Sequence, residues 1–288
     1  MTLTSTTTAK WKAFPCESKA YEYAGANLKK HWPRLHQGDC EPFPDQAWLK
    51  RLLAAHPELE PAMSIKKVTG LLQNAWRAFH RGDFAEAFES GLAVGPLGYN
   101  VTNKAQIIYA SYLEDDPERK SAELTEAAHR AVAMQAAADS EVNGWFLHGQ
   151  ALGRYGQELS VARALAEGLG GKVKASLERS LALEPRHADA HIALGTYHAA
   201  VIHGVGETIG GLTNGASRKA SLDHFEEALQ LNPGSAIARI EYANGLVMMF
   251  GKPRTEQAIG LYEEAAVCQP ADATERLDVE LAKSELAD

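Results

Sequence analysis

The sequence predicts an all-α protein: an array of helix-turn-helix repeats, or α-solenoid, with an irregular helical cap at its N-terminal end. Three segments near the C-terminus share one spacing of small or apolar residues, and each ends in proline. They are Val173, Leu177, Ser180 and Pro185; Ser221, Phe225, Ala228 and Pro233; and Ala258, Tyr262, Ala265 and Pro270. Steps of four and three residues lie on one helical face, and a proline ends a helix because it cannot donate to the preceding turn.

A partner helix with its own pattern precedes two of these segments. Its positions are His191, Leu194, Gly195 and His198 in one case, and Arg239, Tyr242, Ala243 and Leu246 in the other. The resulting unit of helix, turn, helix and proline resembles the tetratricopeptide repeat (TPR), with its Leu-Gly, Tyr-like, Ala, Phe, Ala and Pro positions. The resemblance implies a right-handed array that acts as a binding scaffold and not as an enzyme.

Composition limits the function classes. The 288 residues are 45% hydrophobic and 23% charged, which is ordinary for a soluble globular protein. A net charge of -8 argues against a nucleic-acid-binding surface. The polar start of the chain, residues 1–14, has no apolar run that would serve as a secretory signal or membrane span, so we expect a cytoplasmic protein. Cys16, Cys40 and Cys268 fit no disulfide framework and are expected to be free thiols.

The N-terminal section, residues 1–62, does not match the repeat, and we expect a tail followed by a helical cap. Residues 1–15 are predicted to be frayed because Thr, Ser and Lys dominate. A helix is expected over residues 17–31, ended by Trp32-Pro33, and a second over residues 47–55 after a proline-rich loop. Such a cap would cover the apolar stacking face of the first repeat.

Residues 63–139 are predicted to form two degenerate repeats. The turn Gly82-Asp83 separates a broad apolar stripe from a second helix, in which Gly91 stands where a bulky residue is expected. The second pair covers residues 104–113 and 118–138, and Asp116 is placed to cap its second helix before Pro117.

Residues 140–288 are predicted to hold the better-marked repeats, with two insertions at about 157–171 and 203–217. Gly149 and Val173 are 24 residues apart, where the consensus spacing is about 12. Both insertions are rich in glycine, and insertions in repeat proteins map to loops that often lie on the binding face. Asp272 and Glu275 form a capping-box-like start for a final helix ending near Leu286.

The unit that begins at Trp145, with its insertion and the motif Leu177 to Pro185, is similar to two narrower families. These are repeat proteins of the regulator-of-microtubule-dynamics type and periplasmic repeat proteins associated with TRAP transporters. The resemblance covers roughly residues 140–288 and implies elongated helix pairs that form a pocket. The polar N-terminus counts against the periplasmic family.

Two motifs suggest chemistry, and in both a structural role is favoured. His187, His191, His198 and His203 have spacings that could place three imidazoles on one helical face, but no Glu stands between the first two as a metalloprotease requires. The run 168–172 ends in Gly-Gly-Lys but has Ala166 and Val173 where a phosphate loop needs Gly and Ser or Thr. We therefore expect no metal, no cofactor and no catalytic site.

The TPR resemblance also implies where a ligand binds, because the first helix of each repeat lines the concave groove of that family. Carried onto this chain, the groove residues are Asn143, Phe146, Gln150 and Arg154; Asp189, Ile192 and Thr196; and Ile240 and Asn244. Arg154 could pair with a carboxylate, and the amides could bind an extended peptide. The alternative is that these positions are simply solvated helix faces.

Three functions follow from these observations. The first is a non-catalytic scaffold that binds a protein or peptide partner in the groove. The second is a protein that binds a small organic ligand, with the Gly-rich insertions folded inward to close a pocket. The third is a structural subunit that assembles into homo-oligomers by stacking the ends of its array. Insertions folded outward would favour the first function over the second.

Overall fold

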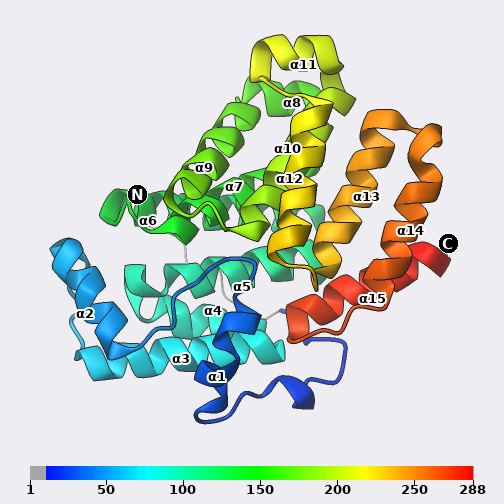
Figure 1. Cartoon of the computed structure of the whole chain (residues 1–288). Coiled ribbons are helices and arrows are strands. Elements are labelled where there is room, and N and C mark those ends of the chain that lie inside the picture. Colours follow the sequence, from blue (N-terminus) through cyan, green and yellow to red (C-terminus); the bar gives the residue numbers. More distant parts are fainter. Residues whose placement is uncertain (1–10, 288) are drawn as a thin grey trace. The chain divides into compact units, whose positions relative to one another are not determined.

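The computed structural model describes residues 11–287 and contains only helices, turns and irregular segments over that range (Figure 1). The chain divides into two compact units. The first unit holds residues up to 32 together with 42–158, and the second holds residues 33–41 together with 159 onward. No helix between residues 11 and 287 is both long enough and apolar enough to cross a membrane.

The first unit is a series of antiparallel helices that pack on their chain neighbours. Its helices are α2 (Gln46–Ala55), α3 (Ile65–Arg81), α4 (Phe84–Leu92), α5 (Tyr99–Tyr112), α6 (Pro117–Ala137) and α7 (Val142–Gln157). Helix α3 packs on α4 and α5 packs on α6, over the residues for which two degenerate repeats are predicted. The second of them begins at Tyr99, five residues earlier than its sequence pattern predicts.

Local signals explain the boundaries of these helices. Asp116 accepts hydrogen bonds from the first N–H groups of α6, as predicted, and Pro117 needs no partner in that first turn. Gly82 ends α3 in the left-handed region, at φ 91°, where glycine is favoured. Gly91 lacks a side chain because a Cβ there would lie 2.4 Å from the hydroxyl of Thr102, so the glycine allows α4 to approach the start of α5 closely.

The second unit contains the regular repeats. Its helices are α8 (Val161–Ala166), α9 (Leu169–Leu183), α10 (Ala188–Val205), α11 (Glu207–Asn214), α12 (Arg218–Leu231), α13 (Ala236–Phe250), α14 (Thr255–Ala266) and α15 (Ala273–Ala287). Helix α10 packs on α12 and α13, and α13 packs on α14. The predicted capping box is present: Asp272 Oδ1 accepts the Glu275 N–H at 2.9 Å, and Glu275 Oε2 accepts the Ala271 N–H at 2.7 Å.

Phe225 forms the centre of this unit and explains its repeat glycines. The ring is fully buried and stacks on Tyr242, with centroids 5.1 Å apart. A Cβ at Gly195 or Gly245 would lie 2.8 or 2.7 Å from that ring. The glycine of the Leu-Gly position is therefore required because two helices approach the same phenylalanine.

The predicted N-terminal helix is wrong in both its start and its end. Residues 19–21 form one 3-10 turn, and Tyr23 and Gly25 have positive φ values, so a helix cannot run through them. Helix α1 (Asn27–Leu35) begins only after this turn and continues through Pro33. Buried Trp32 packs edge-on against Trp76 and Phe43, at 5.7 and 5.1 Å, and this packing outweighs the single backbone bond that proline removes.

Two further predictions on irregular segments need correction. Of the predicted frayed tail, residues 1–10 lie outside the described part of the chain, but Trp11 and Phe14 pack against aromatic side chains of the first unit. The second Gly-rich insertion contains a helix, α11, whose start follows Gly206 and whose end is Gly215 in the left-handed region.

Candidate functional site

The predicted groove positions of the second unit lie on α10 and α13 and form two layers. Ile192 and Ile240 are buried in the core, whereas Thr196 and Asn244 are partly exposed. The Thr196 hydroxyl donates to Glu241 Oε2 at 3.0 Å, and the Tyr262 hydroxyl donates to Asn244 Oδ1 at 2.8 Å. The side chains of Thr196 and Asn244 are therefore held by hydrogen bonds, and Ile192 and Ile240 on the same two helices are buried.

Glu241 is a member of this face that the sequence analysis missed. It is mostly buried, although charged residues are seldom buried without a partner. Its position between Ile240 and Tyr242, both core residues, was a usable signal, because an acidic residue inside a core-facing stretch needs a specific polar contact. The hydroxyl of Thr196 supplies one such contact.

The four predicted groove positions of α7 belong to the first unit. Asn143 and Phe146 are buried, and Gln150 and Arg154 are partly exposed. Arg154 Nη1 donates to Gln157 Oε1, one turn away, at 3.3 Å. The partly exposed residues are those that a ligand could reach in this conformation, and the groove assignment of all nine residues stays a prediction.

The remaining groove position, Asp189, contacts the chain's own N-terminal section. Its backbone N–H donates to the Gly38 carbonyl at 3.0 Å, and a Cβ on Gly38 would lie only 2.2 Å from the Asp189 carboxylate. Residues 33–41 continue along the turns between repeats: Gln37 donates to the Leu231 carbonyl at 3.0 Å, and Arg34 pairs with Glu275 through two bonds of 2.6 and 2.8 Å. The second unit thus includes a helix end and turn from the N-terminal section of the chain.

Cys40 in the same stretch is the thiol with the strongest pKa shift. Burial, together with the nearby carboxylates of Glu184, Asp39 and Asp189, raises the pKa of the Cys40 thiol to about 12. Its sulfur lies 3.6 Å from the Arg186 carbonyl oxygen. A thiol that stays protonated at neutral pH is a poor nucleophile, so this environment suits packing and not catalysis.

The histidines predicted to pack are joined by one that the sequence analysis overlooked. His187 caps α10 by accepting the Ala190 N–H at 3.0 Å. His191 Nδ1 lies 2.9 Å from Nδ1 of His224, and the His198 ring stacks on His224 at 5.8 Å. Burial and the two neighbouring imidazoles lower the pKa of His224 to about 4. Within residues 11–287, no three His, Cys, Asp or Glu side chains converge as metal ligands would.

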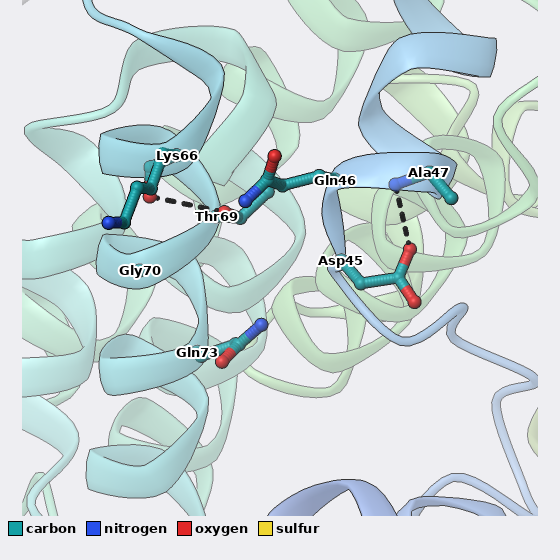
Figure 2. A pocket seen from close by; sticks show the side chains of 7 residues that line it. All are labelled: Asp45, Gln46, Ala47, Lys66, Thr69, Gly70 and Gln73. Carbon is teal, nitrogen blue, oxygen red and sulfur yellow. Dashed lines mark hydrogen bonds between the residues drawn. The ribbon is translucent and has the colours of Figure 1, made fainter.

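A cavity of about 510 Å³ lies in the first unit between α2 and α3 (Figure 2). It is lined by Asp45, Gln46, Ala47, Lys66, Thr69, Gly70 and Gln73. Two of these residues already have partners: Asp45 caps α2 and pairs with Lys29 at 3.0 Å, and the Thr69 hydroxyl donates to its own helix. The Trp48 N–H and the Lys29 ammonium lower the pKa of Asp45, which therefore acts as a charged cap.

Comparison with known proteins supports the fold. A TPR protein from Thermus thermophilus, TTC0263, superposes with a TM-score of 0.54 at 15% identity, over 75% of this chain and 99% of that one. Two structures of MamA align over 73% and 77% of this chain at 14% and 15% identity, with TM-scores of 0.38 and 0.37. No protein-family profile and no curated protein sequence matches the chain. The chain has a TPR-type helical repeat fold, as its sequence predicts.

Proposed function

We propose that the protein is a non-catalytic, cytoplasmic TPR scaffold that binds a protein or peptide segment along α10 and α13. The main support for this proposal is a pair of hydrogen bonds on this face, Thr196 with Glu241 and Asn244 with Tyr262. An extended peptide has unpaired N–H and C=O groups, and fixed carboxylate, amide and hydroxyl groups above an apolar layer can satisfy them. TPR-type neighbours support a scaffold role in general.

The second unit already holds one segment that is distant in sequence, the turn after α1, and this supports the same proposal. Residues 36–41 bind through backbone carbonyls, buried side chains and helix starts, in the manner of a peptide ligand. Arg154 on α7, in the first unit, stays a separate predicted contact that could pair with a carboxylate. These chemistries suit a partner segment with both amide groups and an acidic residue.

The small-ligand alternative has less support. It requires the insertions to fold inward, whereas α11 exposes Ile209 and has Leu212 85% exposed. Apolar side chains directed to solvent favour an open binding face. We therefore treat a co-purifying small molecule and a homo-oligomer as outcomes of the test below.

The test is native mass spectrometry of the protein purified gently from its own host, comparing wild type with the double variant Thr196→Arg/Asn244→Arg. Two added arginines would block the face without entering the core, so the bound partner should be lost. Glu256→Arg, on the exposed face of α14, is the matched control and should keep the partner. A partner retained equally by all three proteins would contradict the proposed face, and a discrete small-molecule adduct would contradict the scaffold.

A further inference from the structure

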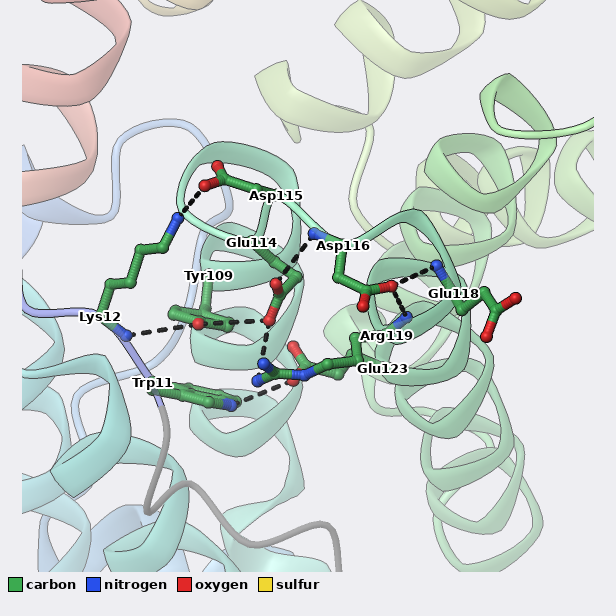
Figure 3. Close-up of polar contacts among 9 residues, drawn as sticks. All are labelled: Trp11, Lys12, Tyr109, Glu114, Asp115, Asp116, Glu118, Arg119 and Glu123. Atoms are coloured by element: carbon green, nitrogen blue, oxygen red, sulfur yellow. Dashed lines mark hydrogen bonds and ion pairs between the residues drawn. The ribbon is translucent and has the colours of Figure 1, made fainter.

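On the first unit, residues 11–14 pack against α4, α5 and α6. Figure 3 shows Trp11 and Lys12 beside Tyr109 of α5 and Glu123 of α6. The Trp11 ring stacks parallel on Tyr109, with centroids 4.2 Å apart and an interplanar angle of 2°. It also packs at 5.2 Å against Phe88. Its indole N–H donates to Glu123 Oε1 at 3.1 Å. One side chain of the segment therefore contacts all three helices.

The next residues extend this contact along the surface. The Lys12 backbone N–H donates to the Tyr109 hydroxyl at 3.3 Å, and the Lys12 ammonium pairs with Asp115, as Figure 3 shows. Phe14 packs edge-on against Phe84 at 6.5 Å and covers Gly82, where a Cβ would lie 2.6 Å from the phenyl ring. The segment thus presents a ring, a cation and a second ring in the pattern Trp-Lys-x-Phe.

The surface beneath the segment is built from buried polar groups. Glu123 is only 2% exposed, and within residues 11–287 its second oxygen, Oε2, has no hydrogen-bond partner. Burial raises the pKa of Glu123 to about 7. Neighbouring Glu114 is fixed by the Tyr109 hydroxyl at 3.3 Å and by Arg119 at 2.9 Å. A surface that combines carboxylates with aromatic rings complements a peptide that carries an indole N–H followed by a lysine.

Residues 11–14 are held to the first unit mainly by side-chain contacts. Residues 11–14 form no helix or turn, and Lys12, Ala13 and Pro15 are exposed. Their contacts are made mostly by three side chains, whereas α4, α5 and α6 are joined by their own packing. This is how a short linear peptide binds a folded domain.

We propose that Phe84, Phe88, Tyr109, Asp115 and Glu123 form a peptide-binding site, that residues 11–14 occupy it in cis, and that a partner protein bearing a Trp-Lys-x-Phe segment displaces them. This site is separate from the proposed face on α10 and α13. A tethered ligand competes at an effective concentration on the order of 1 mM, so a free peptide binds well only when the tethered one is weakened.

The test uses the full chain and a fluorescein-labelled synthetic peptide with the sequence of residues 10–17, in which Ser replaces Cys16. Fluorescence anisotropy should show at least tenfold tighter binding to the double variant Trp11→Ala/Phe14→Ala than to wild type. Pro15→Ala is the matched control and should bind as weakly as wild type. Adding Asp115→Lys to the double variant should abolish this tighter peptide binding, because it removes the partner of the peptide's lysine. Asp115 is 88% exposed, so its change leaves the core intact.

Two results would overturn the proposal. Equal binding of the peptide to wild type and to the double variant would show that the surface is no peptide site. Loss of cooperative thermal unfolding in the double variant, followed by circular dichroism, would show that residues 11–14 are a structural part of the unit. A peptide in which Ala replaces Trp11 should fail to bind the double variant, and binding by that peptide would equally contradict the proposal.

Discussion

Two stretches of the N-terminal section lie on the two units in different ways. Residues 11–14 contact the first unit mainly through the side chains of Trp11, Lys12 and Phe14, and much of the stretch is exposed. Residues 33–41 contact the rest of the second unit through the Gly38 carbonyl and the side chains of Arg34, Gln37 and Cys40. They also contain a buried pair, His36 with Asp39, at 2.8 Å. The comparison teaches that the two stretches differ in the burial of their own residues: His36, Asp39 and Glu41 are buried, whereas Lys12 and Ala13 are exposed.

The largest effect is expected from a substitution that disrupts residues 33–41. Asp39→Ala removes the partner of a buried histidine and the acceptor of the Glu41 N–H. Leaving a buried polar group without its partner typically costs about 1–3 kcal/mol, and two such contacts are lost here, so the free energy of unfolding should fall by roughly 3 kcal/mol. Urea denaturation measures the change. Trp11→Ala is the control and should cost less, about 1–2 kcal/mol, since it removes the ring contacts with Tyr109 and Phe88 and one hydrogen bond. Similar losses in the two variants would contradict the distinction.

A second prediction concerns the pH response of the second unit. The pKa of His224 in the folded chain, about 4, lies below its ordinary value of 6.5, so the folded state binds this proton less well than the unfolded chain does. Stability is therefore full above pH 6.5 and is lost as pH falls toward 4, by an amount on the order of 1–3 kcal/mol. His191 and His198 oppose the added charge, while Asp223 and Glu178 favour it.

Thermal melts of wild type and His224→Gln between pH 7.5 and 4.5 check this expectation. The variant should lose less stability on acidification because it lacks the titrating group. Parallel losses in both proteins would exclude His224 as the cause.

The first unit should respond to pH with the opposite sign. The pKa of Glu123 is raised from 4.5 to about 7, so the folded state holds the proton more tightly than the unfolded chain. The contribution is fully present below pH 4.5 and is lost as pH rises through 7. Glu123→Gln, which stays neutral, should therefore stabilise the protein by about 1–2 kcal/mol at pH 8 and by little at pH 5. A gain of the same size at both pH values would contradict the assignment.

The smallest expected effect on stability is that of Arg154→Glu. Arg154 is partly exposed and its contact with Gln157 lies within one helix, so thermal stability should change by less than about 0.5 kcal/mol. If the groove prediction for this residue is right, partner capture should still be lost. An equal loss of fold would show that Arg154 is structural.

The sequence predicted the fold because its signals are local. The steps of four, three and five residues, the cap at Asp116 and the capping box at Asp272 each depend on neighbours within one turn. The Leu-Gly position is part of the repeat pattern, but only the structure shows that Phe225 is the side chain that needs the space.

What the sequence did not reveal depends on contacts between distant residues. Trp11 lies 98 positions from Tyr109, and nothing near Trp11 in the sequence marks it as packed, except that two aromatic residues, Trp11 and Phe14, interrupt a polar tail. Pro33 was taken as a helix end because the packing of Trp32 on Trp76 is not visible in the local pattern. His224 was overlooked because it belongs to a different helix from the other histidines.

Hydrogen–deuterium exchange of the full-length wild-type chain tests the central distinction most directly. The Cys40 N–H donates to the His36 carbonyl at 3.0 Å within a buried segment, whereas the Lys12 N–H donates to a tyrosine hydroxyl at the surface. The account predicts that peptides covering residues 36–41 exchange as slowly as the core of α10, and that residues 11–14 exchange at least a hundredfold faster, a gap of roughly 2.7 kcal/mol in opening free energy. Equal protection of the two stretches would contradict it.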